Sequence, residues 1–522
     1  MKKLLAFILS LILVLSMAAC TTTPPSDVDA TEKPTEQEGA KPVEVAKSKG
    51  GNPIAGFDGE GNLTYGGDPS ALVVGDTLYL YVGHDTAADE SYVIPEYLCY
   101  STKDMVNWEY HGVVLKMTDV SWAEKNSAWA GQVARHYDEA AGKDMYYMYY
   151  CSWDSTDSGK QSIGVATSDS PTGPFVDIGE ALVKGSFTTD ESSGWNDIDP
   201  TVWIETDENG EEHRYLAWGN SKLYICELNE DMISVKDYDG DGQITFKNDI
   251  RSKTVPASYT EAPWLYRRQD ENGNYYGDYY LFYAYGWREQ MAYATASDLM
   301  EGRFEFQDVI MKPSATSNTN HMAVVDFLGK TWFIYHNGSL PKGSGFRRVA
   351  CVEELRFYSD GSLYTLEETA TGAFGTVSTI TALNGEALAH AHFNNSSLDD
   401  TYPYKDVVLG SGLDKATELD AQWEIVAGKA DASDVYTVSI ESYNKGGLYV
   451  TVTDGGVVLS QDYDGKMAQA QTFRTVEGLA GRGVSFESLA QPGKYLTLSG
   501  GALTLSDGSD VNAVSFIIAN VE

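Results

Sequence analysis

The feature that most constrains the fold is a pattern that recurs five times between residues 68 and 336, at intervals of 60 to 70 residues. Each copy opens with a polar or aromatic residue, continues into an apolar strand, turns at Gly, Asp or Asn, and ends in a tyrosine-rich strand. Each copy then adds two short strand segments, so one copy supplies four strands. The residues that open the copies are Asp68, Trp129, Asp199, Glu261 and His321.

A single four-stranded unit cannot bury both of its faces, and five such units can share their cores by closing around an axis. The repeat therefore predicts a five-bladed β-propeller over residues 51–370. The first residues of equivalent innermost strands converge on the axial channel of a propeller, so we expect the five opening residues to face one another. Helical periodicity is scarce in this region, and a plain β-sandwich does not explain a period near sixty residues.

The spacing shortens from about residue 386, where a smaller unit recurs every 43 to 50 residues. Its copies include residues 421–426, 471–476 and 514–518. Three related units of this size predict a β-trefoil over residues 386–522, after a linker at residues 371–385. The whole chain is therefore expected to be all-β.

The N-terminus has the pattern of an export signal. Lys2 and Lys3 precede an apolar run that ends at Ala18-Ala19-Cys20, and this run is too short to remain as a membrane span. Small residues followed by Cys are typical of a bacterial lipoprotein, which predicts a signal peptide at residues 1–19 and lipidation of Cys20. A simple cleaved signal with an incidental Cys is the alternative.

Residues 20–50 are rich in Thr, Pro, Glu, Lys and Ser, which predicts a disordered tether. With the lipidated cysteine before it, the chain is expected to be an extracellular, cell-surface lipoprotein that meets the membrane only through its lipid anchor.

The formal net charge of −39 argues against nucleic acid and against anionic lipid surfaces as partners, because the summed field repels phosphates. A neutral polysaccharide is compatible with this charge, although solubility alone also explains it. Four cysteines stand in aromatic, strand-like contexts without CxxC spacing, and we predict that they are buried free thiols. They are Cys99, Cys151, Cys226 and Cys351.

Three of the five residues that open the repeats are carboxylic acids, which is unusual for one channel. Repulsion and burial raise at least one pKa in such a group, and proteins keep the arrangement mainly where chemistry requires it. Hydrolysis of a glycosidic bond needs a protonated acid for the leaving oxygen and an ionised carboxylate that activates water or attacks carbon. The Asp-Pro pairs at Asp68 and Asp199 are, taken singly, more typical of turns; the register that they share with Glu261 favours catalysis.

Residues 52 to about 370 resemble glycoside hydrolase family 43, of the α-L-arabinofuranosidase and β-xylosidase type. The resemblance lies in Gly-Asp-Pro-Ser at 67–70, Asp-Ile-Asp-Pro at 197–200 and Tyr-Thr-Glu-Ala-Pro-Trp at 259–264. It implies that Asp68 is the general base and that Glu261 is the general acid of an inverting reaction without a covalent intermediate. Asp199 would tune the pKa of the general acid and help to orient it. Ala262 stands where the family usually has Gly.

The resemblance also implies roles for residues near the channel centre. His321 matches a family histidine that is associated, through water, with a bound calcium, so a structural calcium in the channel is expected; a satisfied core histidine is the alternative. Arg348 matches an arginine that reaches the sugar, with Arg347 as the neighbouring alternative. Trp129 is expected either to form an apolar wall for the sugar or to pack in the core. No organic cofactor is implied.

Residues 237–248 have the acidic spacing of an EF-hand loop. The twelfth position is Asn248 instead of Glu, however, and no flanking helices are indicated. We therefore predict an acidic turn, with a peripheral calcium loop as the alternative.

The C-terminal units resemble the arabinose-binding module of the AbfB type, most clearly over residues 436–518. In that module the sugar pockets normally use a His and an Asp. Here the His positions hold Val452 and Leu498, and the Asp positions hold Gln471 and Asn512. We therefore expect the fold of this module to be kept and its arabinose binding to be weak or altered.

These observations predict an inverting exo-acting hydrolase that releases α-L-arabinofuranose from side chains of arabinoxylan or arabinan. Its partner would be a plant cell-wall polysaccharide or an arabino-oligosaccharide. A β-xylosidase or endo-arabinanase of the same family, and a non-catalytic carbohydrate-binding surface lipoprotein, are the alternatives. A retaining fructosidase-type propeller is disfavoured because the chain has no Asn-Asp-Pro-Asn-Gly or Glu-Cys-Pro segment.

Overall fold

The computed structural model describes residues 40–139, 141–157, 159–188, 194–207, 209–391 and 407–521. The predicted signal peptide at residues 1–19, Cys20, and the predicted tether as far as residue 39 lie outside the described residues. Among the residues that are described, no helix has the length and apolar character needed to span a bilayer.

Five antiparallel sheets make up the part of the chain from residue 66 to residue 355. Their strands are β1 (Gly66–Val74), β2 (Thr77–His84), β3 (Glu96–Thr102) and β4 (Glu109–Lys116); β5 (Gly131–Asp138), β6 (Lys143–Asp154), β7 (Lys160–Ser168) and β8 (Val176–Asp177); β9 (Thr201–Thr206), β10 (Glu212–Trp218), β11 (Leu223–Glu227) and β12 (Arg251–Lys253); β13 (Tyr259–Gln269), β14 (Tyr275–Tyr285), β15 (Gln290–Ala296) and β16 (Glu305–Met311); and β17 (Met322–Phe327), β18 (Lys330–Asn337) and β19 (Val349–Leu355). A 3-10 turn, η1 (Met117–Asp119), follows β4.

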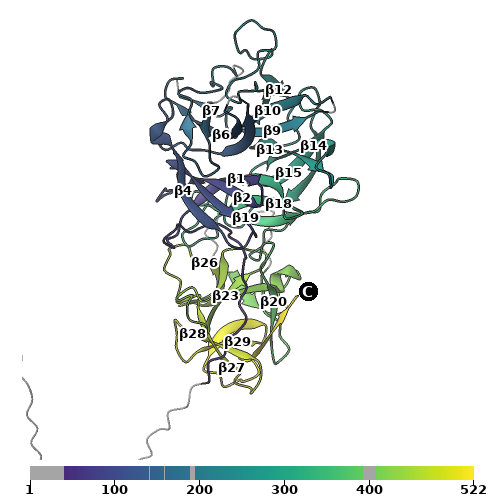
Figure 1. The fold of residues 1–522 in the computed structure, drawn as a ribbon. Helices are drawn as coiled ribbons and strands as arrows, with labels where there is room; N and C mark the ends of the chain where they lie inside the picture. The colour runs from purple at the N-terminus through teal and green to yellow at the C-terminus, as the bar shows by residue number, and fades with distance from the viewer. Residues whose placement is uncertain are drawn as a thin grey trace, which may run out of the picture. The chain divides into compact units, whose positions relative to one another are not determined.

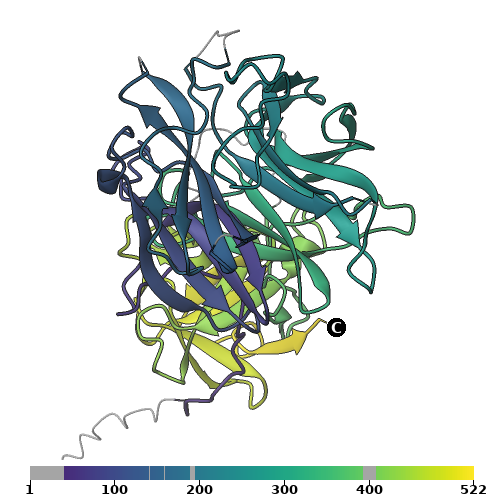
Figure 2. The ribbon, with the colours of Figure 1, turned by 45° about the horizontal axis from the view of Figure 1, so that its top comes forward.

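The five sheets close into a ring through their first strands (Figure 1; Figure 2). β1 contacts β5, β5 contacts β9, β9 contacts β13, β13 contacts β17, and β17 contacts β1 again. The fold of this part is therefore the five-bladed β-propeller that the repeat predicts. Within the described residues the fifth blade has three strands, where the repeat predicts four.

The second strand of a blade is covered on both faces by neighbouring blades, which explains its continuous run of large side chains. In β6 the residues from Tyr146 to Asp154 are buried with one exception, Trp153, and in β14 the residues from Tyr279 to Ala284 are all buried. The four predicted thiols, at positions 99, 151, 226 and 351, are buried and free, which confirms that prediction.

The C-terminal part is rich in β-structure and forms one twelve-stranded sheet. Its strands are β20 (Val377–Ala382), β21 (Ala389–His390), β22 (Val407–Gly410), β23 (Trp423–Ala427), β24 (Thr437–Ser442), β25 (Leu448–Thr453), β26 (Gly456–Gln461), β27 (Phe473–Glu477), β28 (Val484–Ser488), β29 (Tyr495–Ser499), β30 (Ala502–Ser506) and β31 (Phe516–Asn520), with a 3-10 turn, η3 (Leu419–Ala421), before β23. Each of the three recurring units in the sequence supplies a strand that opens on a buried aromatic residue: Trp423, Phe473 and Phe516.

The structure differs from two predicted boundaries. Residues 377–382, inside the predicted linker, form β20, whose alternating burial is the period-two pattern of a strand with one covered face. Residues 42–48, inside the predicted tether, bond to the C-terminal sheet: Val43 N–H donates to Thr475 O at 3.0 Å, and Ser48 N–H donates to Ile425 O at 2.7 Å. These polar segments are ordered by backbone hydrogen bonds, which composition does not reveal.

Candidate active site

A cavity of about 380 Å³ lies at the channel end of the first strands. All five residues that open the sequence repeats line it, together with Arg348. The structure thus brings together every site residue that was predicted within the propeller. They are Asp68, Trp129, Asp199, Glu261, His321 and Arg348.

The backbone around the three acids departs from regular strand geometry. Asp68, Asp199 and Ala262 have φ angles of 53°, 61° and 56°, in the left-handed region that residues with a side chain rarely adopt. The pairing register shifts next to Asp68 in β1 and on both sides of Glu261 in β13. Such irregularities bend a strand and redirect its side chains, and they concentrate at functional sites.

Asp68 is held by one contact to its side chain and one to its backbone. Arg348 Nη1 lies 2.6 Å from Asp68 Oδ1, and the Asp68 N–H donates to His336 Nδ1 at 3.1 Å. Burial alone would raise the pKa of Asp68, but its basic neighbours, chiefly Arg348, outweigh burial and hold this pKa below its usual value. Asp68 is therefore an ionised carboxylate at neutral pH.

His336 is held as the neutral tautomer that carries its proton on Nε2. Nδ1 accepts the Asp68 N–H, so Nε2 is the nitrogen that donates, to Thr319 O at 3.0 Å. Burial, with the Arg348 charge nearby, lowers the pKa of His336 to about 3. This neutral imidazole fixes the backbone at Asp68 and adds no charge.

Arg348 is itself fixed by a second carboxylate. Its Nε and Nη2 bond the two oxygens of buried Asp85 at 2.9 and 3.0 Å, while Nη1 bonds Asp68. Arg347, the neighbouring alternative, instead donates to backbone carbonyls such as Lys342 O. Of the two arginines, Arg348 is the one that faces the cavity.

The pKa values of Glu261 and Asp199 are raised, whereas that of Asp68 is lowered. Burial raises the pKa of Glu261, with the charge of Asp68 adding to it, although Asn220 Nδ2 donates to Glu261 Oε2 at 2.6 Å. Burial and repulsion by Glu261 and Asp68 raise the pKa of Asp199 well above its usual value. Asp199 also accepts the Ala262 N–H at 3.0 Å, which ties it to the backbone beside Glu261.

Sequence reasoning missed several polar residues of the site, among them Asp85, Asn220, Glu289 and His336. Each of these four stands at the end of the second strand of a blade or in the turn that follows it, the strands being β2, β10, β14 and β18. Because the second strand runs antiparallel to the first, it ends where the first begins, beside the opening acids. The sequence signal that could have found them is the polar residues that follow the tyrosine-rich strands.

Aromatic rings form one side of the cavity. Trp129 lies 5.0 Å from Trp195 and 6.2 Å from Tyr92 between ring centroids, and Tyr92 lies 4.8 Å from Phe346. Trp129 is only partly buried, and Trp195 is 45% exposed. Flat apolar rings of this kind suit the faces of a sugar.

His321 lines the cavity, and burial lowers its pKa to about 4, so it is neutral. Calcium takes six to eight oxygen ligands, and an imidazole is not one of them. Among the described residues, the acid and histidine groups close enough to share one ion do not include His321. A calcium beside His321 would need oxygen ligands from elsewhere, so this metal stays a prediction.

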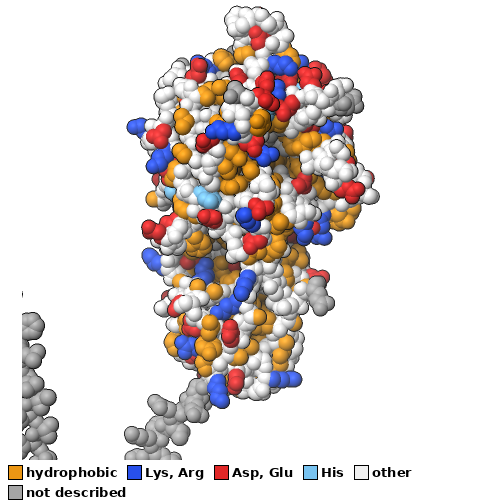
Figure 3. Space-filling view, in the orientation of Figure 1, with side chains coloured by type: hydrophobic (Ala, Val, Ile, Leu, Met, Phe, Trp, Pro, Cys, Tyr) orange, Lys and Arg blue, Asp and Glu red, His pale blue; other side chains and the backbone are white. Residues whose placement is uncertain are grey.

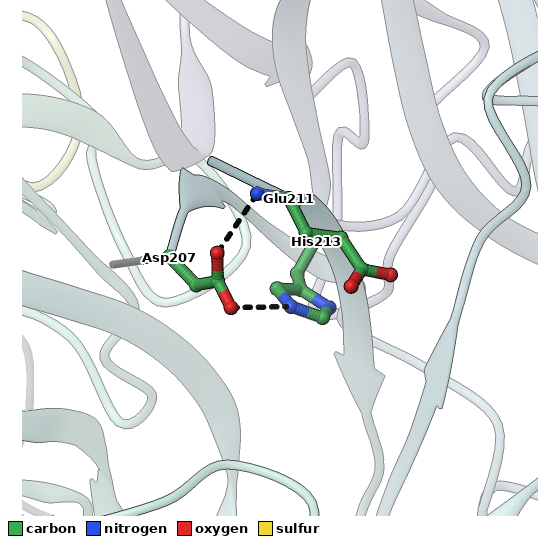
Figure 4. A group of neighbouring side chains, drawn as sticks. All are labelled: Asp207, Glu211 and His213. Carbon is green, nitrogen blue, oxygen red and sulfur yellow. Dashed lines mark hydrogen bonds and ion pairs between the residues drawn. The ribbon is translucent and has the colours of Figure 1, made fainter. Parts of the chain in front are cut away.

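Two clusters of metal-type side chains lie away from the cavity lining. In the first, Asp207 accepts the Glu211 N–H at 2.8 Å and faces His213 Nε2 at 3.9 Å (Figure 4). The second joins Asp237 and Asp239 of the predicted acidic turn with buried Asp249. Asp237 accepts the N–H groups of Gly240 and Gly242, as expected for an acidic turn.

Two family models match the chain. Glycosyl hydrolases family 43 matches residues 64–363, and the Alpha-L-arabinofuranosidase B (ABFB) domain matches residues 392–516. A xylosidase/arabinosidase of Bacteroides ovatus is 30% identical over 58% of this chain and 95% of its own length. A beta-D-galactofuranosidase of Aspergillus niger is 27% identical over 63% of this chain and 89% of its own length. An arabinoxylan arabinofuranohydrolase of Paenibacillus polymyxa is 27% identical over 71% of this chain and 58% of its own length.

Proposed function

Since the chain belongs to glycosyl hydrolases family 43 and is a glycoside hydrolase, we propose that it releases α-L-arabinofuranose from arabinoxylan or arabinan by an inverting, exo-acting reaction. The observation that carries the mechanism is the opposite shift of two carboxyl pKa values in one cavity. Arg348 holds the pKa of Asp68 below its usual value, and burial raises the pKa of Glu261 above its usual value. A hydrolase needs this division between base and acid.

In the proposed reaction Glu261 gives its proton to the glycosidic oxygen as the bond from that oxygen to the anomeric carbon breaks. Asp68 takes a proton from a water molecule, whose oxygen attacks the anomeric carbon from the opposite face. The products are the free sugar with inverted configuration and the shortened chain. Asp68 then returns its proton to solvent and Glu261 regains one, which restores the starting state.

The preference for arabinofuranose is supported by the ABFB-domain match and by relatives named for arabinosidase activity. The cavity volume is near the low end for small-molecule sites, which suits a terminal sugar unit better than a long chain. β-Xylosidase activity is the second candidate, because the Bacteroides ovatus relative carries both activities in its name. Endo-arabinanase action would require a groove open at both ends.

For the C-terminal part we propose a β-trefoil that contacts plant cell-wall polysaccharide. Three strands that open on buried aromatic residues, spaced as the sequence units are, support this fold. Among the described residues on the face drawn in Figure 3, Lys and Arg are interspersed with Asp and Glu, with no continuous basic stripe of the kind that follows nucleic acid. A neutral polysaccharide fits such a surface.

The export features remain proposals supported by sequence alone. We propose removal of residues 1–19, lipidation of Cys20 and an extracellular, cell-surface location with membrane contact through the lipid only. A structural calcium in the propeller channel is likewise proposed on the resemblance at His321.

The proposed activity is tested with aryl α-L-arabinofuranosides, aryl β-D-xylosides and arabinoxylan as substrates. We expect release of arabinose, and a loss of kcat of about 10²- to 10⁴-fold in both Glu261→Gln and Asp68→Asn. Release of xylose alone would select the second candidate. Wild-type rates in either variant would overturn the assignment of acid and base.

A further inference from the structure

A fourth carboxylic acid, Glu289, lies in the cavity next to the proposed general acid. It follows β14, is 3% exposed, and lines the same cavity as Glu261. Its Oε2 accepts the Asn320 N–H at 2.7 Å, and its side chain shares a hydrogen bond with Glu261. Two carboxyl groups can bond to each other only when at least one of them carries a proton.

Charge and burial favour Glu289 as the donor, although Glu289 also accepts one N–H, from Asn320. Glu261 accepts the Asn220 amide and feels the Arg348 charge, and both favour its ionised form. Glu289 is deeply buried and faces two other acids, Glu261 and Asp199. Burial and this repulsion raise the pKa of Glu289 well above its usual value, whereas the bond that Glu289 donates works to lower the pKa of Glu261.

We propose that Glu289 is a positioning residue that keeps its proton and donates a hydrogen bond to Glu261 throughout the reaction. The inference rests on the proposed role of Glu261 as general acid. As Glu261 passes its proton to the glycosidic oxygen, the hydrogen bond from Glu289 falls on a carboxylate that is gaining negative charge. Hydrogen bonds to a charged oxygen are about twice as strong as neutral ones, so this bond strengthens as the proton leaves.

The proposal predicts a dependence on the leaving group. A phenyl glycoside needs protonation of its leaving oxygen, whereas a dinitrophenyl glycoside leaves with little help from an acid. Glu289→Leu removes the donor and should lower kcat on the phenyl glycoside by about 10- to 100-fold, with a change below about threefold on the dinitrophenyl glycoside. Glu289→Gln keeps an uncharged donor of the same shape and should retain kcat on both substrates within about threefold.

The pH profile gives a second readout. Without the donated bond, Glu261 holds its proton more tightly, so the alkaline limb of kcat/KM in Glu289→Leu should move up by about one pH unit, while Glu289→Gln leaves it in place. Asp199, Asp68 and Arg348, which also act on Glu261, are unchanged in both variants.

Two results would overturn the inference. Equal losses on both substrates in Glu289→Leu, with the alkaline limb unmoved, would mean that Glu289 only supports the structure. A downward shift of that limb in Glu289→Gln would mean that Glu289 is an anion in the wild type. A wild-type enzyme without glycosidase activity, or a fully active Glu261→Gln variant, would instead refute the proposed function.

Discussion

At the scale of single residues, the site depends on backbone conformations that its residues adopt at a cost. Ala262 has a φ of 56°, and its N–H donates to Asp199 Oδ2. The sequence shows that Ala stands where glycine is usual, but the cost becomes clear only from this angle. A side chain in the left-handed region costs about 1–2 kcal/mol, which glycine avoids.

Ala262→Gly should therefore raise the free energy of unfolding by up to about 1 kcal/mol, since glycine's own loss of chain entropy offsets part of the relief. Urea unfolding followed by tryptophan fluorescence measures the change. Ala284→Gly, at the residue paired with Glu261 on β14, is the control and should lower stability. A less stable Ala262→Gly protein would contradict the argument.

The charges of the site predict an unusually wide pH range. Arg348 holds the pKa of Asp68 below the usual aspartate value of about 3.9, and burial holds the pKa of Glu261 above the usual glutamate value of about 4.3. The base is thus ionised down to low pH, and the acid stays protonated as pH rises. In kcat/KM the acid limb should lie below about pH 4, and the alkaline limb should vanish in Glu261→Gln assayed with a dinitrophenyl glycoside. An alkaline limb that persists unchanged in this variant would assign it to another group.

At the scale of strands, the first strand of each blade was easier to predict than the turn after the second strand. The repeat correctly brings the five opening residues, including Asp68, Asp199 and Glu261, to one cavity. Glu289 and Asn220 were missed because no repeat marks the turns after the second strands, whose lengths and residues differ between blades. Local polarity there looks like an ordinary turn until the antiparallel pairing places it beside the acids.

β19 carries a buried acid whose titration should couple to stability. Glu353 Oε1 accepts Asn52 Nδ2 at 3.2 Å and Thr369 Oγ1 at 2.8 Å, and burial raises its pKa to about 8. Between the unfolded value near 4.5 and this folded value, the folded protein holds a proton that the unfolded chain has lost. Stability from this group is therefore complete below about pH 4.5 and is lost as pH rises toward 8.

Glu353→Gln removes this titration and keeps an oxygen acceptor. Near the middle of the range from pH 5 to 8, the wild type should lose about 1.4 kcal/mol of unfolding free energy per pH unit more than the variant does. Urea unfolding at several pH values measures both slopes. Glu354→Gln, at the next residue, where the side chain is paired with Lys330, is the control. Parallel slopes for the wild type and Glu353→Gln would refute the coupling.

At the scale of the whole molecule, the sequence predicted the propeller because a long period repeated five times leaves few alternatives. The prediction failed at the segment before the propeller, residues 42–48, and at the segment after it, β20. Both join the C-terminal sheet through backbone hydrogen bonds, which leave no side-chain pattern in the sequence. The propeller and the C-terminal sheet also bond each other directly: Gln461 Nε2 donates to Gly338 O at 2.8 Å, and Lys342 N–H donates to Asp462 O at 2.8 Å. Composition alone gives no sign of such contacts.

The central claim is that Asp68 activates water on the side of the sugar opposite to Glu261. Proton NMR of the first-formed sugar, recorded during hydrolysis of an aryl α-L-arabinofuranoside before the anomers equilibrate, tests it most directly. The account predicts that the β-anomer appears first and the α-anomer grows in later. First appearance of the α-anomer would mean retention through a covalent intermediate, and would contradict the role given to Asp68.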